Sequence, residues 1–186
     1  MRSRGERDSV VDYPTPSQAI EALSKAGCSP QVIEHCKIVS QLAVRLARLA
    51  EQKGIEVDIN LVRVGGLLHD IGRSRTHGVE HGFMGSTIID SYGYSPAIAR
   101  ITERHVGAGI SSSEAQKLGL PKRDFIPETL EEKLVCYADK LIEGKRRVPF
   151  DEALDDFAKG LGADHPAVER LRNLHSELIR LIGEPQ

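Results

Sequence analysis

The chain of 186 residues is long enough for one domain with a single hydrophobic core. Charged residues make up 28% and the formal net charge at pH 7 is −2, so bulk attraction to nucleic acid or to an acidic membrane is not expected. Aromatic residues make up 4%, with no Trp, which argues against a surface on which several bases stack.

The chain contains three cysteines, Cys28, Cys36 and Cys136, and no two of them form a closely spaced pair. This usage favours a reducing compartment and argues against a zinc site built from thiolates. Residues 1–8 are charged and lack the apolar core of a signal peptide, and no apolar stretch has the length of a membrane span. We therefore expect a cytoplasmic protein with no membrane partner.

The first elements expected along the chain are a loose arm and two helices. The arm covers residues 1–14, which are mostly polar and mixed in charge, and a single domain is expected over residues 15–186. A helix begins around residues 14–17 and ends at Gly27, and a longer helix follows over about residues 30–53.

The longer helix has a serine N-cap, Ser29, followed by a proline at its first position, and Gly54 closes it. His35 stands three residues after Val32 and four before Val39, so it lies on the inward face. The apolar stripe on that face consists of Val32, Cys36, Val39, Leu42, Ala43, Leu46 and Leu49.

The third predicted helix ends in the sequence Leu67-Leu68-His69-Asp70-Ile71-Gly72. Its apolar residues repeat at three-to-four spacing, which favours a buried helix over a strand. The last turn would therefore place His69 and Asp70 in the interior, and Gly72 is expected to take the left-handed conformation that ends a helix. Burying an imidazole beside a carboxylate is costly unless their polar groups are compensated, and a divalent cation compensates them well.

Caps and helix breakers set the remaining boundaries. Asp58 or Asn60 would begin the third helix, residues 73–80 form a loop over the His-Asp pair, and Asp164 would cap the last helix. The basic run of residues 145–147 is expected at a helix C-terminus, where it favours the dipole. With short loops and no predicted strand, the elements make an all-α bundle. Helices are predicted over about residues 81–91, 96–105, 112–118, 127–143, 150–160 and 166–182.

Four inward-facing polar residues stand out: His35, His69, Asp70 and Asp139. They come from three predicted helices, and the core of a bundle is where such helices converge on one ion. Two histidines with two carboxylates suit Mn, Fe, Co, Ni or Zn better than Ca or Mg, because imidazole favours the transition metals. The competing interpretation is a polar core without an ion.

The order and helix placement of these four residues resemble the HD-domain metal-dependent phosphohydrolases, whose defining pattern is H…HD…D. The run His69-Asp70-Ile71-Gly72 is similar to the HDIG subgroup. The resemblance implies an HD-domain helical bundle with the metal site in its core. It also covers residues 104–110, 118–121 and 129–133, which look like a small, mainly archaeal HDIG group. That group includes the enzyme that opens the 2′,3′-cyclic phosphate of dihydroneopterin.

Two more histidines extend the resemblance to relatives that bind two metals. His81 begins the helix predicted over residues 81–91, and His105 ends the one over residues 96–105. By this resemblance Asp70 would bridge the two ions and be catalytic, with His81 and His105 in one site and His35, His69 and Asp139 in the other. The sequence departs from some relatives because Val106, not a second histidine, follows His105. A helix cap or surface position is the alternative for these two histidines.

Three residues near the expected site are candidates for binding substrate: Arg73, His77 and Lys140. Relatives place a basic residue at the position of Arg73, and a guanidinium there would bind two phosphate oxygens and take part in catalysis. The competing interpretations are an exposed loop for Arg73 and His77, and a local salt bridge for Lys140. The last two histidines, His165 and His175, are expected on the surface.

These observations predict a metal-dependent phosphohydrolase with one or two transition-metal ions, since two bridged ions activate water and stabilise phosphoryl oxygens. The predicted activity is phosphodiesterase hydrolysis of a small cyclic nucleotide- or pterin-type phosphate ester. A small phosphorylated substrate and no polynucleotide are expected as partners, and the oligomeric state stays open, a homo-oligomer included. The alternatives are nucleotide or dinucleoside polyphosphate hydrolysis at the same site, and an HD scaffold that binds a nucleotide without turnover.

Overall fold

The computed structural model describes residues 13–183 of the chain. The loose arm predicted over residues 1–14 therefore lies almost wholly outside the described residues, and the arm and the single domain both stay predictions. Within the described range, Pro14 is buried. The Tyr13 hydroxyl donates a hydrogen bond to the Asp58 carboxylate at 3.0 Å, so the chain is already anchored at this point.

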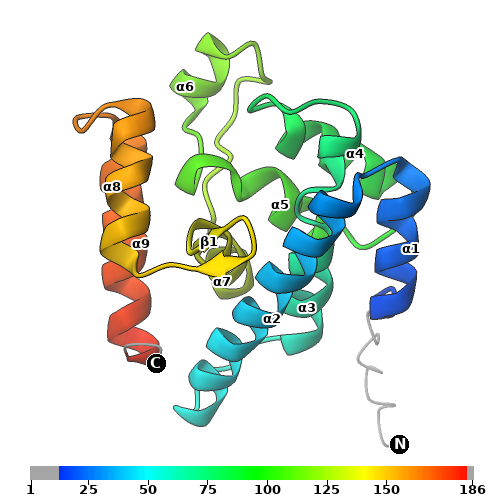
Figure 1. Cartoon of the computed structure of the whole chain (residues 1–186), viewed down its shortest axis with the longest axis horizontal. Coiled ribbons are helices and arrows are strands. Elements are labelled where there is room, and N and C mark those ends of the chain that lie inside the picture. Colours follow the sequence, from blue (N-terminus) through cyan, green and yellow to red (C-terminus); the bar gives the residue numbers. More distant parts are fainter. Residues whose placement is uncertain (1–12, 184–186) are drawn as a thin grey trace, which may run out of the picture.

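Helices make up most of the regular structure in the described part of the chain, which confirms the all-α fold class (Figure 1). The two short elements η1 and η2 are 3-10 helices, and they lie directly beside the histidines singled out from the sequence. In chain order the elements are α1 (Pro16–Ala26), α2 (Pro30–Gln52), α3 (Ile59–Leu68), η1 (Ile71–Ser74), α4 (His81–Ser91), α5 (Pro96–Arg104), η2 (Val106–Ala108), α6 (Ser112–Lys117), α7 (Leu130–Lys140), β1 (Ile142–Glu143), β2 (Arg146–Arg147), α8 (Phe150–Leu161) and α9 (Pro166–Ile182).

The first three helices begin where their capping residues predict. The Thr15 hydroxyl accepts a hydrogen bond from the Gln18 backbone in a capping box, Ser29 caps α2, and Asp58 caps α3. Gly27 ends α1 in the left-handed conformation at φ 95°, which a glycine adopts without steric cost.

The prediction of no strand was wrong at one place, and so was the helix C-terminus expected over residues 145–147. Helix α7 ends at Lys140, and β1 then pairs antiparallel with β2 across a turn in which Gly144 has φ 59°. Buried Ile142 and Val148 hold the two sides of this small hairpin against the core. The chain reverses here because a glycine permits the turn and apolar residues on both sides can be buried.

Two caps and one histidine also differ from prediction. His165, not Asp164, caps α9, with its Nδ1 accepting from the Ala167 backbone N–H at 3.2 Å. Ser111 caps α6, whereas the sequence suggested Ser112 or Ser113 for this role. His175 is half-buried rather than a surface group: its ring stacks on Phe150, with 3.6 Å between ring centroids, because α9 packs beside α8 and α7.

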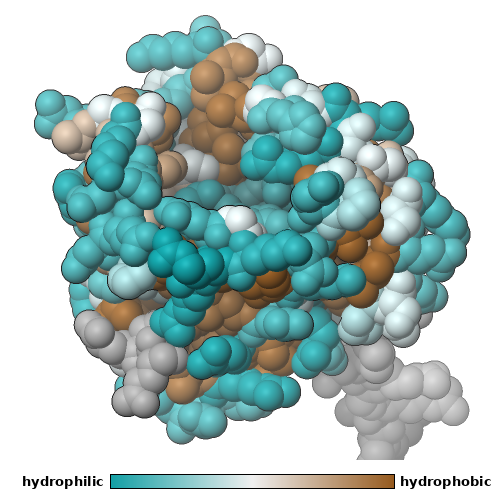
Figure 2. Space-filling model, in the orientation of Figure 1, coloured by the Kyte–Doolittle hydropathy of each residue, from teal (hydrophilic) through white to brown (hydrophobic). Residues whose placement is uncertain are grey.

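The helices surround a core to which α2 and α3 contribute much of the buried apolar surface. Figure 1 shows α2 and α3 crossing the middle of the molecule, α4 and α5 above them, α8 with α9 along one side, and α6 projecting from the top. Figure 2 shows a mostly hydrophilic face on which a hydrophobic stretch below α6 borders a hollow. None of the helices described is both long and apolar enough to cross a membrane.

Candidate metal centre

Two glycines let α3 pack closely against its neighbours and bury the residues at its end. A Cβ on Gly66 would lie 2.8 Å from the Cα of Ser40 on α2, and a Cβ on Gly65 would lie 2.5 Å from a methyl carbon of Ile101 on α5. Side chains larger than hydrogen would push these helices apart. His69 and Asp70, which follow α3, are consequently 0% and 3% exposed.

The turn after Asp70 corrects the role expected of Gly72. Gly72 does not adopt a positive φ; it lies within η1, against the first turn of α4. A Cβ at this position would collide with the backbone carbonyl oxygen of His81. Glycine is required here for close approach of two backbone segments, and this approach brings His81 next to Asp70.

Three of the four clustered histidines are oriented in the same way by their own backbone. The Nδ1 atoms of His69, His81 and His105 each lie 2.7 Å from the carbonyl oxygen three residues earlier. A carbonyl can only accept, so each Nδ1 carries the proton and donates it. In a neutral imidazole, Nε2 then presents its lone pair to the cluster, which is how metal-ligating histidines are commonly oriented.

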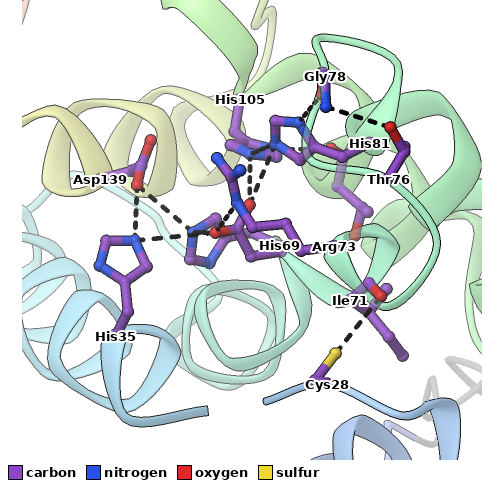
Figure 3. A network of polar contacts seen from close by, with 12 residues as sticks. Cys28, His35, His69, Ile71, Arg73, Thr76, Gly78, His81, His105 and Asp139 are labelled. Atoms are coloured by element: carbon purple, nitrogen blue, oxygen red, sulfur yellow. Dashed lines mark hydrogen bonds and ion pairs between the residues drawn. The ribbon is translucent and has the colours of Figure 1, made fainter. Parts of the chain in front are cut away.

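The carboxylate of Asp70 lies between two groups of histidines, and each of its oxygens faces one group. The four histidines are labelled in Figure 3. Asp70 Oδ1 lies 3.1 Å from His81 Nε2 and 3.3 Å from His105 Nε2. Asp70 Oδ2 lies 3.8 Å from His69 Nε2 and 4.0 Å from His35 Nε2. One carboxylate therefore has an oxygen available to each of two neighbouring cation positions.

Asp139, near the end of α7, completes the group around Asp70 Oδ2. Its Oδ1 lies 3.0 Å from His35 Nε2 and 3.4 Å from His69 Nε2. Its other oxygen accepts a short hydrogen bond from the Lys140 ammonium. His35 is the most accessible member of the cluster, with 21% of its side chain exposed, so this side of the centre is open to solvent.

The electrostatics of the cluster favour added positive charge. Burial alone would raise the pKa of Asp70, but the neighbouring His69, His105 and His81 together hold it well below its usual range. Burial likewise opposes ionisation of Asp139, and Lys140 with the adjacent histidines keeps its pKa well below the ordinary value. Both carboxylates are therefore anionic at neutral pH and need cationic partners.

His105 shows the opposite tendency. Burial, together with the charges of His69 and His81, lowers the pKa of His105 to about 4, against the attraction of Asp70. Its ring is therefore neutral near pH 7 and its Nε2 lone pair is available. A neutral imidazole is the form that binds a metal ion.

The residues present fit a divalent transition metal. Buried His69 Nε2 and Asp70 Oδ1 have no hydrogen-bond partner, although buried polar atoms normally have one. His81 Nε2 and His105 Nε2 face each other at 3.0 Å with both Nδ1 protons already donated elsewhere, so a cation is needed between their lone pairs. Ligand atoms about 2.1 Å from one ion lie roughly 3–3.4 Å from each other, as many atoms of this cluster do. The site thus meets the chemical demands of one or two ions.

The structure brings together all six residues predicted as ligands. Within the described residues, the triads that offer ligand atoms within 4.8 Å of one another are His35–His69–Asp70, His69–His105–Asp139 and Asp70–His81–His105. His81 and His105 are buried, which excludes the surface alternative for both. That these six residues bind metal stays a prediction.

The three predicted substrate contacts differ in their surroundings. The Arg73 Nε donates to Asp70 Oδ2 at 2.6 Å, and 30% of its side chain is exposed, so the guanidinium lies beside the cluster (Figure 3). Lys140 forms a local salt bridge with Asp139, which was the competing interpretation of this residue. His77 is exposed in the loop before α4. Their contact with substrate stays a prediction.

A bundle whose core gathers histidines and aspartates around a shared carboxylate is the architecture of a metal-dependent hydrolase. Residues 32–143 match the HD domain family. The chain therefore belongs to the HD-domain family, the superfamily of metal-dependent phosphohydrolases to which its H…HD…D pattern pointed. The metal identity is not fixed by the donor set, because several divalent ions accept the same histidine and carboxylate ligands.

Two relatives of the chain are archaeal proteins. It is 52% identical over 155 residues to an uncharacterized protein of Methanocaldococcus jannaschii, covering 83% of this chain and 92% of that protein. It is 40% identical over 182 residues to a tRNA (cytidine(56)-2′-O)-methyltransferase of Thermoplasma volcanium, covering 97% of this chain. The chain spans only about half of that methyltransferase, 51% of its length.

The fold is similar to a solved HD domain. The structure aligns with the HD domain of the L. monocytogenes phosphodiesterase PgpH in complex with cyclic-di-AMP, with a TM-score of 0.52. The sequences are 15% identical, and the alignment covers 90% of this chain and 98% of that one. This likeness establishes the shared HD-domain fold.

Proposed function

We propose that the protein is a metal-dependent phosphodiesterase that opens a small cyclic phosphate ester of the nucleotide or pterin type. The observation that carries this proposal is the division of the Asp70 carboxylate, with Oδ1 facing His81 and His105 and Oδ2 facing His69 and His35. When two ions are bound this way, they activate water and stabilise the oxygens of a phosphoryl transition state.

The protein's own groups supply the rest of the reaction. Arg73 uses Nε to hold Asp70, which leaves the two terminal nitrogens of its guanidinium to donate to a non-bridging phosphate oxygen. Lys140 holds the outer oxygen of Asp139, so the carboxylate presents Oδ1 to the histidines. In the proposed reaction, water adds to phosphorus, one ring P–O bond breaks, and a proton reaches the leaving oxygen. The product is a phosphate monoester.

The surroundings support a compact substrate. The ligand side chains are almost entirely buried except for His35 and Asp139, so access is from the side where these residues and Arg73 lie. A single anionic phosphate group can reach the cluster through this opening, with Arg73 beside it. A cyclic phosphodiester places its scissile bond close to such a centre without a long chain following it.

A second candidate is the same cyclic ester at the end of an RNA. The observation that favours it is the relative of double length, which is named as a tRNA methyltransferase and contains a region 40% identical to nearly all of this chain. An RNA substrate would contradict the expectation that no polynucleotide binds. One assay distinguishes the two candidates. Both substrates carry the same cyclic phosphate, and they differ only in the group attached to it.

The test is a substrate panel with protein purified without chelators and supplied with Mn²⁺, Fe²⁺ or Co²⁺. The panel holds 2′,3′-cyclic nucleotides, dihydroneopterin 2′,3′-cyclic phosphate, an oligoribonucleotide ending in a 2′,3′-cyclic phosphate, cyclic-di-AMP, nucleoside monophosphates and diadenosine tetraphosphate. Phosphorus NMR identifies the bond that breaks. We expect ring opening of the small cyclic phosphates. Cleavage of only the polyphosphate or monophosphates would replace this proposal with a nucleotide hydrolase, and tight binding without turnover would replace it with a nucleotide sensor.

Two variants test the part played by Arg73. Arg73→Ala should impair turnover while the bound metal content stays unchanged, because its terminal nitrogens are proposed to bind phosphate. Arg75→Ala, an exposed arginine two residues further along the same segment, is the matched control and should leave turnover unchanged. Equal activity of the two variants would remove Arg73 from the proposed mechanism.

A further inference from the structure

The two residues before His105 are charged, and both are withdrawn from solvent. Glu103 is 6% exposed, and both of its carboxylate oxygens accept from Arg123, at 2.8 and 2.7 Å. The Arg104 side chain is 12% exposed, and its Nη1 donates to Glu132 at 2.9 Å. The C-terminal end of α5, which carries His105, is therefore held by ion pairs from two separate segments of the chain.

Glu132 links this end of α5 to the helix that carries Asp139. Its side chain is 2% exposed, and it lies seven residues before Asp139, so the two carboxylates are two turns apart on the same face of α7. Arg100, one turn before Arg104 on α5, also approaches Glu132, at 3.5 Å. The same face of α7 thus carries two carboxylates: Glu132 contacts α5, and Asp139 faces the metal centre.

A second contact between α5 and α7 lies at the histidine itself. The Cys136 thiol of α7 is 3.4 Å from the backbone carbonyl oxygen of His105, while the His105 ring donates from Nδ1 to Thr102. The backbone of His105 is therefore set by α7, and the ring is set by α5. Any displacement between these two helices moves Nε2 relative to Asp70.

We infer that Arg104 and Glu132 are positioning residues for the second ion of the centre, the one between Asp70, His81 and His105. Their ion pair is buried, so removing the charge of one partner leaves the other compensated only by a more exposed group, Glu128 for Arg104 or Arg100 for Glu132. Relieving that charge shifts α5 against α7, and metal ligands tolerate errors of only about 0.2 Å. In the proposed division of ligands, the ion near His35, His69 and Asp139 takes no ligand from the end of α5 and should be retained. This inference rests on the proposed two-ion centre but not on the substrate.

The chain offers a matched pair of variants. Glu132→Gln keeps the side-chain oxygen that accepts from the backbone N–H groups of Glu128 and Thr129 in the α7 cap, and it removes only the charge. Glu128→Gln removes a carboxylate that also lies 2.8 Å from Arg104 Nη1 but whose side chain is 68% exposed. Burial is the difference between them, and exposed ion pairs contribute little.

The experiment is a Mn²⁺ titration of the whole chain, followed by calorimetry, by metal analysis and by the EPR signal of a spin-coupled manganese pair. We expect the wild type and Glu128→Gln to bind two ions. Glu132→Gln should bind the first ion normally and the second roughly 10- to 100-fold more weakly, with the coupled signal lost. Retention of the first ion shows that the core of the variant is folded.

Further outcomes decide the inference. Arg104→Gln combined with Glu132→Gln removes both buried charges and should recover second-ion binding relative to either single variant. A Glu132→Gln protein that melts at a lower temperature but keeps two tightly bound ions would show a purely structural pair and overturn the inference. Equal weakening of both ions would overturn it as well. A wild type that binds only one ion would instead refute the two-ion centre itself.

Discussion

Substitution of Gly72 by alanine tests whether the close contact between η1 and α4 builds the centre. The new Cβ would overlap the His81 carbonyl oxygen and lie 2.6 Å from the Gly85 nitrogen and 2.9 Å from the His81 carbonyl carbon. All three atoms belong to the backbone, so no flexible side chain can move aside. Relief requires η1 and the first turn of α4 to separate, and this displaces His81.

The expected loss of stability in Gly72→Ala follows from the kind of contact. Overpacking a well-packed interior costs about 1–3 kcal/mol, and the upper end applies here because the obstacle is backbone. A loss of about 3 kcal/mol lowers the melting temperature by roughly 6–12 °C in a chain of this size. Gly160 is the matched control: it lies within α8, and a Cβ there meets nothing within 4 Å. Gly160→Ala should stabilise by about 0.5–1 kcal/mol.

Thermal denaturation followed by circular dichroism measures both variants, and metal analysis accompanies it. Gly72→Ala should melt well below the wild type and bind the ion near His81 more weakly, whereas Gly160→Ala should melt slightly above it with unchanged metal content. A Gly72→Ala protein that melts within about 2 °C of the wild type and holds the same metal would refute the reasoning. It would mean that the two segments can separate without affecting the centre.

Three more predictions concern charge. Asp70→Ala should lose both ions and the activity together in metal analysis and turnover assays, because it removes the shared carboxylate; a fully loaded, active variant would end the metal hypothesis. Chelation should lower the melting temperature, since an ion bound only by the native state adds about 2.7 kcal/mol at a free concentration of 100 Kd; no shift after verified removal would favour a polar core without metal. Burial of Glu114 is outweighed by hydrogen bonds from Arg170 and Ser111, which lower its pKa to about 2. Because this native value is below the unfolded one, its contribution is present at neutral pH and is lost as the pH falls towards 2. Glu114→Gln should therefore cost about 1–2 kcal/mol at neutral pH and less near pH 3 in urea titrations, and a pH-independent cost would contradict the assignment.

The helical frame was predictable because its signals are local. Caps such as Thr15, Ser29 and Asp58 act within one turn, and the apolar stripe of α2 follows from periodicity alone. The hairpin of β1 and β2 was missed because two-residue strands have no period to detect. His175 was misplaced because its burial depends on Phe150, which reaches it only after α8 and α9 pack together.

The residues of the candidate metal site were predictable to a similar degree, but the contacts that hold them in position were not. The H…HD…D pattern and the two added histidines identified every residue of the cluster found in the described structure. Glu132 gave only the signal of a capping box with Thr129, which any surface helix can show. Its pairing with Arg104 joins residues 28 positions apart and depends on how α5 meets α7. Contacts of this kind produce no recognisable spacing pattern in the sequence.

The glycines explain why a short motif can build a centre from so many helices. Histidine side chains are short, so His69 reaches its partners only if α3 packs closely on its neighbours. Gly66 permits close approach to the backbone of α2, and Gly65 makes room for the Ile101 side chain of α5. On the other side, a Cβ on Gly82 would lie 2.7 Å from Val106 of η2, and one on Gly85 would lie 2.5 Å from Thr102 of α5, so α4 depends on glycine in the same way against these two elements. Each glycine pair sets the distance of one histidine group from Asp70. Enlarging a residue of the first pair should therefore disturb the ion near His69, and enlarging one of the second pair should disturb the ion near His81.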